Sequence, residues 1–119
     1  MKRIIVIIFV SLIICGCSNY ESINKDSLNI EEIRNIMLNT EYIIIDVRTK
    51  EEYDSGHIVG AVNIPYDEIN ESVDVYKSKT IFVYCKSGNR SNIAFNYLKE
   101  LGYTVYDLGA YSKIDLPKE

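Results

Sequence analysis

Cys85 and Arg90 are the residues whose types and spacing point most directly to chemistry. Residues 86–89 separate them, after an apolar run at 80–84 and before a helical pattern. A loop between a strand and a helix directs several backbone N–H groups into one small concavity, and the helix N-terminus adds partial positive charge. Together with the charges of Lys86 and Arg90, this arrangement favours a thiolate on Cys85 and makes it nucleophilic.

The four-residue spacing limits what the loop can hold. Cysteine-dependent phosphatases place five residues between cysteine and arginine, because their loop must surround a phosphoryl group. The position where that arginine would fall is occupied here by Ser91. A phosphatase or arsenate reductase is therefore the least favoured hypothesis, and the loop fits a group the size of a sulfur atom on the cysteine. The candidate binding loop comprises Lys86, Ser87, Gly88, Asn89 and Arg90.

A second segment carries further motifs in a fixed order. Asp-Val-Arg at 46–48 closes an apolar run, and Glu-Tyr, Gly-His-Ile, Gly-Ala and Asn-Ile-Pro follow between residues 52 and 65. Together with the Cys85 loop, these motifs resemble the rhodanese (sulfurtransferase) family over residues 30–116. One departure is the absence of tryptophan. The tail Gly-Ala-Tyr-Ser-Lys at 109–113 replaces the usual Gly-Gly…Trp, and we expect Tyr111 to fill that volume.

The resemblance implies a fold and an activity. The fold would be α/β with three layers, a central and mostly parallel sheet of about five strands, and helices on both faces. The activity would be sulfur transfer from a small sulfane donor such as thiosulfate to a thiol or cyanide, through a persulfide on Cys85 and with no cofactor. The loop amides would hold the persulfide. Arg90 would either bind an anionic donor or support the loop, and Lys86 could attract such a donor.

Other polar residues are expected to support this site. Asp46 ends a buried strand and must be paired, and Arg48 is expected to be a member of a structural ion pair. The family uses the His57 position structurally, so we do not expect a Cys–His dyad. One histidine and one free cysteine make no ligand set, so no metal site is predicted.

The residues leave one functional alternative open. A membrane-tethered persulfide carrier or rhodanese-like binding module would need Cys85 as much as an enzyme does. A redox partner protein that regenerates the thiol is conceivable for both. The net charge of −4 and the absence of a basic stripe argue against nucleic-acid binding.

Periodicity and turn residues predict strands that alternate with helices, as in a parallel sheet covered on both faces. Asn29 with Glu32, and Thr49 with Glu52, form capping patterns that open helices. We expect strands at 42–47, 61–64, 81–84 and 103–108, helical segments from 30, 50 and 66, a helix at 91–101, and a short turn or helix within 109–119.

The N-terminus has a different character. Two basic residues precede an apolar run at 4–14, which is too short to span a bilayer and is typical of a signal peptide. Ile-Cys-Gly-Cys at 14–17 resembles a bacterial lipobox. We expect residues 1–16 to be a signal peptide, Cys17 to be lipidated, 17–26 to be a tether, and 27–119 to be a single rhodanese-like domain. The domain would lie outside the cytoplasm, anchored to the cell membrane; a secreted, released protein is the alternative.

Overall fold

The computed structural model describes residues 28–119. The expected signal peptide, the lipidation site at Cys17 and the tether lie outside these residues. Within the described part of the chain, no helix is long and apolar enough to cross a bilayer.

Four parallel strands form the sheet, in the order β2-β1-β3-β4. Their bounds are β1 Tyr42–Asp46, β2 Val62–Asn63, β3 Thr80–Cys85 and β4 Val105–Ala110. The predicted α/β class and parallel sheet are confirmed, and the described residues contain four strands where about five were expected. All six residues of β3 are buried, as a central strand of a parallel sheet covered on both faces requires.

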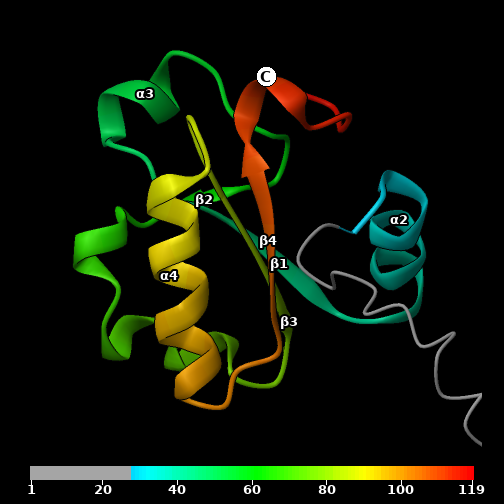
Figure 1. Cartoon of the computed structure of the whole chain (residues 1–119), viewed down its shortest axis with the longest axis vertical. Coiled ribbons are helices and arrows are strands. Elements are labelled where there is room, and N and C mark those ends of the chain that lie inside the picture. The colour runs from blue at the N-terminus through cyan, green and yellow to red at the C-terminus, as the bar shows by residue number, and fades with distance from the viewer. Residues whose placement is uncertain (1–27) are drawn as a thin grey trace, which may run out of the picture.

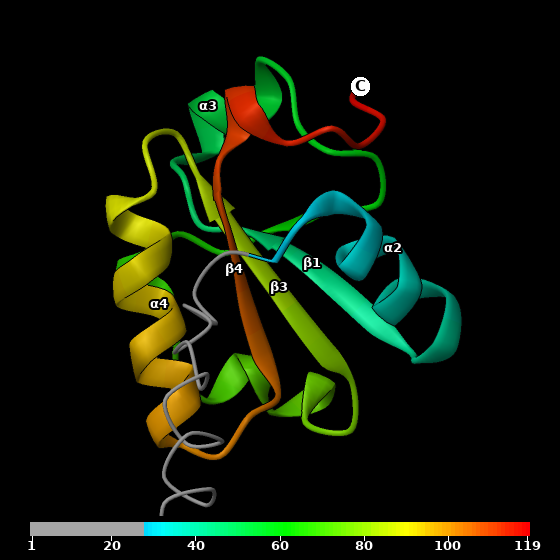
Figure 2. The same cartoon turned by 45° about the vertical axis from the view of Figure 1, so that its right-hand side comes forward.

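Helices cover both faces of the sheet and make three layers (Figure 1 and Figure 2). Helix α4 lies against one face and α2 lies on the other, while the short α3 sits near the carboxyl ends of the strands. The helical segments are α2 Ile30–Asn39, α3 Lys50–Asp54, α4 Asn89–Glu100, and the 3-10 helices η2 Tyr66–Glu68, η3 Glu71–Tyr76 and η4 Tyr111–Lys113. Both predicted capping boxes are present, at the starts of α2 and α3.

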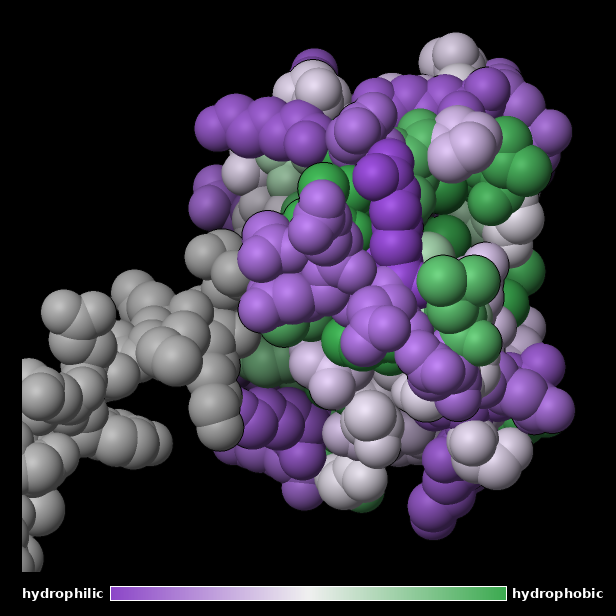
Figure 3. Space-filling view, turned by 90° about the vertical axis from the view of Figure 1, so that its right-hand side faces the viewer, coloured by the Kyte–Doolittle hydropathy of each residue, from purple (hydrophilic) through white to green (hydrophobic). Residues whose placement is uncertain are grey.

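Helix α2 is amphipathic. Ile33 is buried against the sheet, while Glu31, Glu32 and Arg34 are exposed. The outer face on this side is accordingly covered mostly by hydrophilic side chains, with separate hydrophobic areas between them (Figure 3). This alternation is what a surface helix needs in order to pack on one side only.

Alternate side chains of β3 enter two separate cores. Ile81, Val83 and Cys85 belong to the cluster that contains Ala94 and Leu98 of α4. Phe82 and Tyr84 belong to the other cluster, with Ile33 of α2. Because side chains of a strand point to opposite faces in turn, Cys85 is directed to the α4 side.

The last strand begins and ends two residues later than the predicted 103–108. The turn after α4 extends through Tyr103, whose N–H bonds to the carbonyl of Leu98. The strand then continues past Leu108 because a bulge shifts its register: Val83 pairs with Asp107, but Tyr84 pairs with Gly109. Gly109 has a φ of 80°, a conformation that glycine adopts without strain.

Candidate active site

Cys85 is the last residue of β3 and is completely buried. Its Sγ accepts a hydrogen bond from the backbone N–H of Gly88 at 2.9 Å. As a thiol it donates to Oγ of Ser91 at 3.4 Å, and that hydroxyl donates to the carbonyl of Gly88 at 3.2 Å. Among residues 28–119, Cys85 is unpaired by any disulfide. The sulfur is therefore held inside the turn between β3 and α4, with polar groups directed at it.

Gly88 makes this turn possible. Its φ of 102° is in the left-handed region, where a residue with a side chain would be strained. It is the N-cap of α4, and no side chain caps that helix end. The first turn of α4 also carries no acidic residue. The loop and helix N–H groups consequently remain available to an anion on the sulfur. Of the other predicted loop residues, Lys86, Ser87 and Asn89 are exposed and Arg90 is half-buried.

Arg90 does not reach freely into solvent, because it forms a two-pronged ion pair with Glu52 of α3. Nη1 lies 2.7 Å from Oε1, and Nη2 lies 3.1 Å from Oε2. The hydrogen bond from Arg90 holds the pKa of Glu52 at about 2, and the same contact raises the pKa of Arg90. A thiolate on Cys85 would also raise the pKa of Arg90, because opposite charges stabilise each other. The sequence pattern predicts Glu52 only as a helix cap, and its pair with Arg90 was not predicted.

Asp46 and Arg48 form a buried ion pair with each other; the sequence predicted that each would be paired but did not name the partner. Nη2 of Arg48 lies 2.6 Å from Oδ2 of Asp46, and their side chains are 6% and 0% exposed. The hydroxyl of Tyr84 donates to the same carboxylate at 2.7 Å and accepts from the N–H of Ile58 at 3.1 Å. Burial raises the pKa of Tyr84, so its hydroxyl stays protonated and donates. The network ties β1 to β3 directly beneath the loop; the participation of Tyr84 was not predicted.

Tyr111 of η4 packs on the residues beneath the loop. Its ring stacks on Tyr84, with centroids 5.8 Å apart, and the guanidinium of Arg48 lies 4.4 Å from its centroid. A tyrosine ring thus packs against the ion-pair network, and one wall of the site is built from the chain's C-terminal part.

A cleft of about 380 Å³ opens beside the loop. It brings together three segments: the turn from β1 into α3, the Cys85 loop, and η4. Its lining residues are Arg48, Glu52, Ser55, Lys86, Tyr111 and Ser112. Lys86 is exposed at this cleft, and its positive charge would attract a small anionic molecule.

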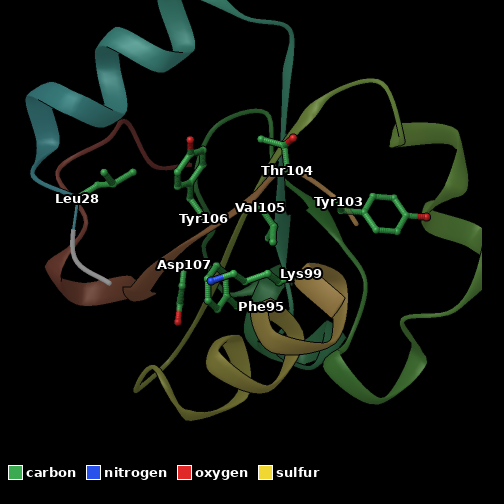
Figure 4. A pocket seen from close by; sticks show the side chains of 8 residues that line it. All are labelled: Leu28, Phe95, Lys99, Tyr103, Thr104, Val105, Tyr106 and Asp107. Atoms are coloured by element: carbon green, nitrogen blue, oxygen red, sulfur yellow. The ribbon is translucent and has the colours of Figure 1, made fainter. Parts of the chain in front are cut away.

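A second cavity, of about 260 Å³, lies elsewhere, against β4 (Figure 4). Phe95 and Lys99 of α4 line it together with residues 103–107 and Leu28. None of the Cys85 loop residues contributes to it, so it does not belong to the candidate site.

His57 lies outside the sulfur's hydrogen-bond network. Its Nδ1 is 2.9 Å from the carbonyl of Tyr53, and its Nε2 is 3.1 Å from Oε1 of Glu119. The imidazole stacks on the Tyr53 ring at a centroid distance of 3.8 Å. These contacts fasten the end of the described chain to the segment after α3. No cluster of three or more metal-ligating side chains occurs within residues 28–119.

Residues 29–114 match the family model described as the rhodanese-like domain. The chain belongs to the rhodanese-like family. Thiosulfate sulfurtransferase PspE of Escherichia coli is 41% identical over 78 residues, which cover 62% of this chain and 75% of PspE. YqhL of Bacillus subtilis is 34% identical over 118 residues, covering 94% of this chain and 91% of that protein.

Other relatives carry a rhodanese-like region within a longer protein. The adenylyltransferase and sulfurtransferase uba4 of Ogataea parapolymorpha is 33% identical over 92 residues, which are 75% of this chain but 23% of uba4. Among solved structures, a rhodanese with anions from E. coli superposes with a TM-score of 0.61 at 38% identity, over 66% of this chain and 96% of that one. The expected rhodanese-like fold is thereby confirmed.

Proposed function

We propose that this rhodanese-like protein is a sulfurtransferase that carries sulfane sulfur as a persulfide on Cys85. The observation that supports it most strongly is the position of the sulfur, at the carboxyl end of a central strand and inside a turn where the N–H of Gly88 donates to it. Membership of the rhodanese-like family supports sulfur transfer as the class of reaction. The donor and acceptor assignments are part of the proposal.

The reaction has two displacement steps. The Cys85 thiolate attacks the outer sulfur of thiosulfate, a new S–S bond forms, and sulfite leaves with the electron pair of the broken bond. The thiolate of an acceptor, or cyanide, then attacks the outer sulfur of the persulfide, and the Cys85 thiolate leaves. N–H groups of residues 86–90 stabilise the anionic persulfide between the two steps.

We also propose where the reaction takes place. The N-terminal sequence pattern supports a lipid anchor on Cys17 and a location outside the cytoplasm, at the bacterial cell membrane. A thiol on the sulfur acceptor, and a partner that keeps Cys85 reduced, would then have to be present in that compartment.

The test is sulfur transfer from thiosulfate to cyanide and to a dithiol by the full chain, purified in detergent. Intact-mass analysis is expected to show an adduct of about 32 Da, the mass of one sulfur atom, on Cys85. Cys85→Ser should lose both the adduct and turnover while its circular dichroism stays unchanged. Transfer retained by this variant would refute the mechanism, and an adduct without turnover would favour the persulfide carrier.

A further inference from the structure

The charges around the Cys85 loop are mostly neutralised by their neighbours. Arg90 is held by both carboxylate oxygens of Glu52, and the two side chains are only 25% and 26% exposed. Arg48, which lines the same cleft, is held by Asp46. Within residues 28–119, Lys86 is therefore the one basic residue lining this cleft that has no ion-pair partner.

The neutralisation of Arg90 is built into the local fold. Glu52 is the third residue of α3, and its carboxylate also accepts the N–H of Thr49 in the capping box at 3.1 Å. The helix cap thus fixes the carboxylate in the position where it meets Arg90. With a pKa of about 2, Glu52 remains ionised throughout the neutral range, so the pairing does not change with pH there.

We infer that Glu52 controls how strongly the site selects sulfur donors by their charge. By neutralising Arg90 it leaves Lys86 as the free positive charge lining the cleft, and the site therefore prefers the thiosulfate dianion over singly charged sulfane donors, such as thiosulfonates and persulfides, less strongly than a loop with an unpaired arginine would. The inference rests on the proposed sulfurtransferase function and concerns the donors of that same site. Arg90 then acts chiefly by holding α3 against the loop.

Thiosulfate and methanethiosulfonate are a matched pair of donors, because a methyl group replaces one anionic oxygen. In both cases the Cys85 thiolate attacks the outer sulfur and the donor's S–S bond breaks. The leaving group is sulfite in the first case and methanesulfinate in the second, and the same Cys85 persulfide anion forms. The intrinsic reactivity of each donor is common to all protein variants, so a change in the ratio of their rate constants reports on the protein.

The experiment measures the rate constant of Cys85 persulfide formation from each donor, by intact mass, in the full chain in detergent. Glu52→Gln removes the charge but keeps an acceptor for the capping box. Glu51→Gln is the matched control, because this exposed neighbour on the same helix makes no ion pair in the described structure. We expect Glu52→Gln to raise the thiosulfate-to-methanethiosulfonate ratio by about fivefold, as one extra unit of donor charge near a freed cation would.

Glu51→Gln should leave the ratio unchanged, and adding Arg90→Met to Glu52→Gln should return it to the wild-type value. Adduct formation with an unchanged ratio in Glu52→Gln, or an equal loss with both donors, would overturn the role of Glu52 and leave the proposed function standing. If neither donor produces a Cys85 adduct in any variant, the proposed function fails and the inference fails with it.

Discussion

The sulfur of Cys85 has two hydrogen-bond partners, and both belong to the turn that begins α4. In the thiol, S–H donates to Ser91, whose hydroxyl donates onward to the carbonyl of Gly88. When the thiolate forms, the Ser91 hydroxyl can rotate and donate to the sulfur. In a persulfide the charge moves to the outer sulfur, so this hydrogen bond stabilises mainly the free thiolate.

Ser91→Ala should therefore slow the chemistry of Cys85. We expect the rates of Cys85 alkylation by iodoacetamide and of sulfur transfer to fall by roughly tenfold, which corresponds to the free energy of one hydrogen bond to a charged group. Both rates are to be measured at one pH, with circular dichroism as the check on folding. Ser87→Ala is the control, because Ser87 is an exposed serine of the same loop. Equal rates for the two variants would contradict the role of Ser91.

At the scale of elements, the buried pair of Asp46 and Arg48 joins strands to the turns that carry the site. Asp46 ends β1 and accepts from Tyr84 of β3, while Arg48 donates to the carbonyl of Gly56 at 2.6 Å, just beyond α3. Removing one charge of such a pair leaves the other charge buried without a counter-charge. This change lowers the free energy of unfolding more than replacing both residues by apolar ones does.

Asp46→Asn is accordingly expected to lower the free energy of unfolding by about 3 kcal/mol or more, because Arg48 stays buried without a counter-charge. Urea unfolding followed by circular dichroism measures this. Asp54→Asn breaks the pair between Asp54 and Lys50, whose side chains are 54% and 79% exposed, and should lower the free energy of unfolding far less, because solvent screens an exposed pair. Similar losses for the two variants would show that Asp46 does not carry the stabilisation assigned to it.

Local sequence patterns predicted the elements that local forces specify. The capping boxes at Asn29 and Thr49, and the Cys85 loop, depend on residues within a few positions of one another. The Glu52–Arg90 pair joins residues 38 positions apart, and the tertiary fold, which brings Glu52 of α3 to the first turn of α4, decides it. The shifted end of β4 depends on a bulge opposite β3, which periodicity within β4 does not show.

At the scale of the molecule, the site is assembled at one end of the sheet from segments far apart in sequence. Contributions come from the end of β1, from α3, from the β3–α4 loop and from η4, and Figure 1 shows them gathered at the carboxyl ends of the strands. The carboxyl ends of parallel strands all lie at the same end of the sheet. Charged side chains and a nucleophile from several turns can therefore lie close together there.

The attachment of the domain to the membrane is a property of the whole chain, and the sequence pattern at residues 1–17 predicts it. If Cys17 is lipidated, residues 17–26 could extend at most about 35 Å, and this length limits how far the domain could lie from the bilayer. We expect the full chain to fractionate with bacterial membranes and to incorporate an alkynyl fatty acid, and Cys17→Ser to lose the label. Cys15→Ser is the control, because this residue precedes the expected cleavage point and should leave labelling unchanged. Label retained by Cys17→Ser would refute the lipid anchor at Cys17. The fatty-acid label is the deciding measurement, because an uncleaved signal peptide could also hold the chain at the membrane but would carry no acyl group.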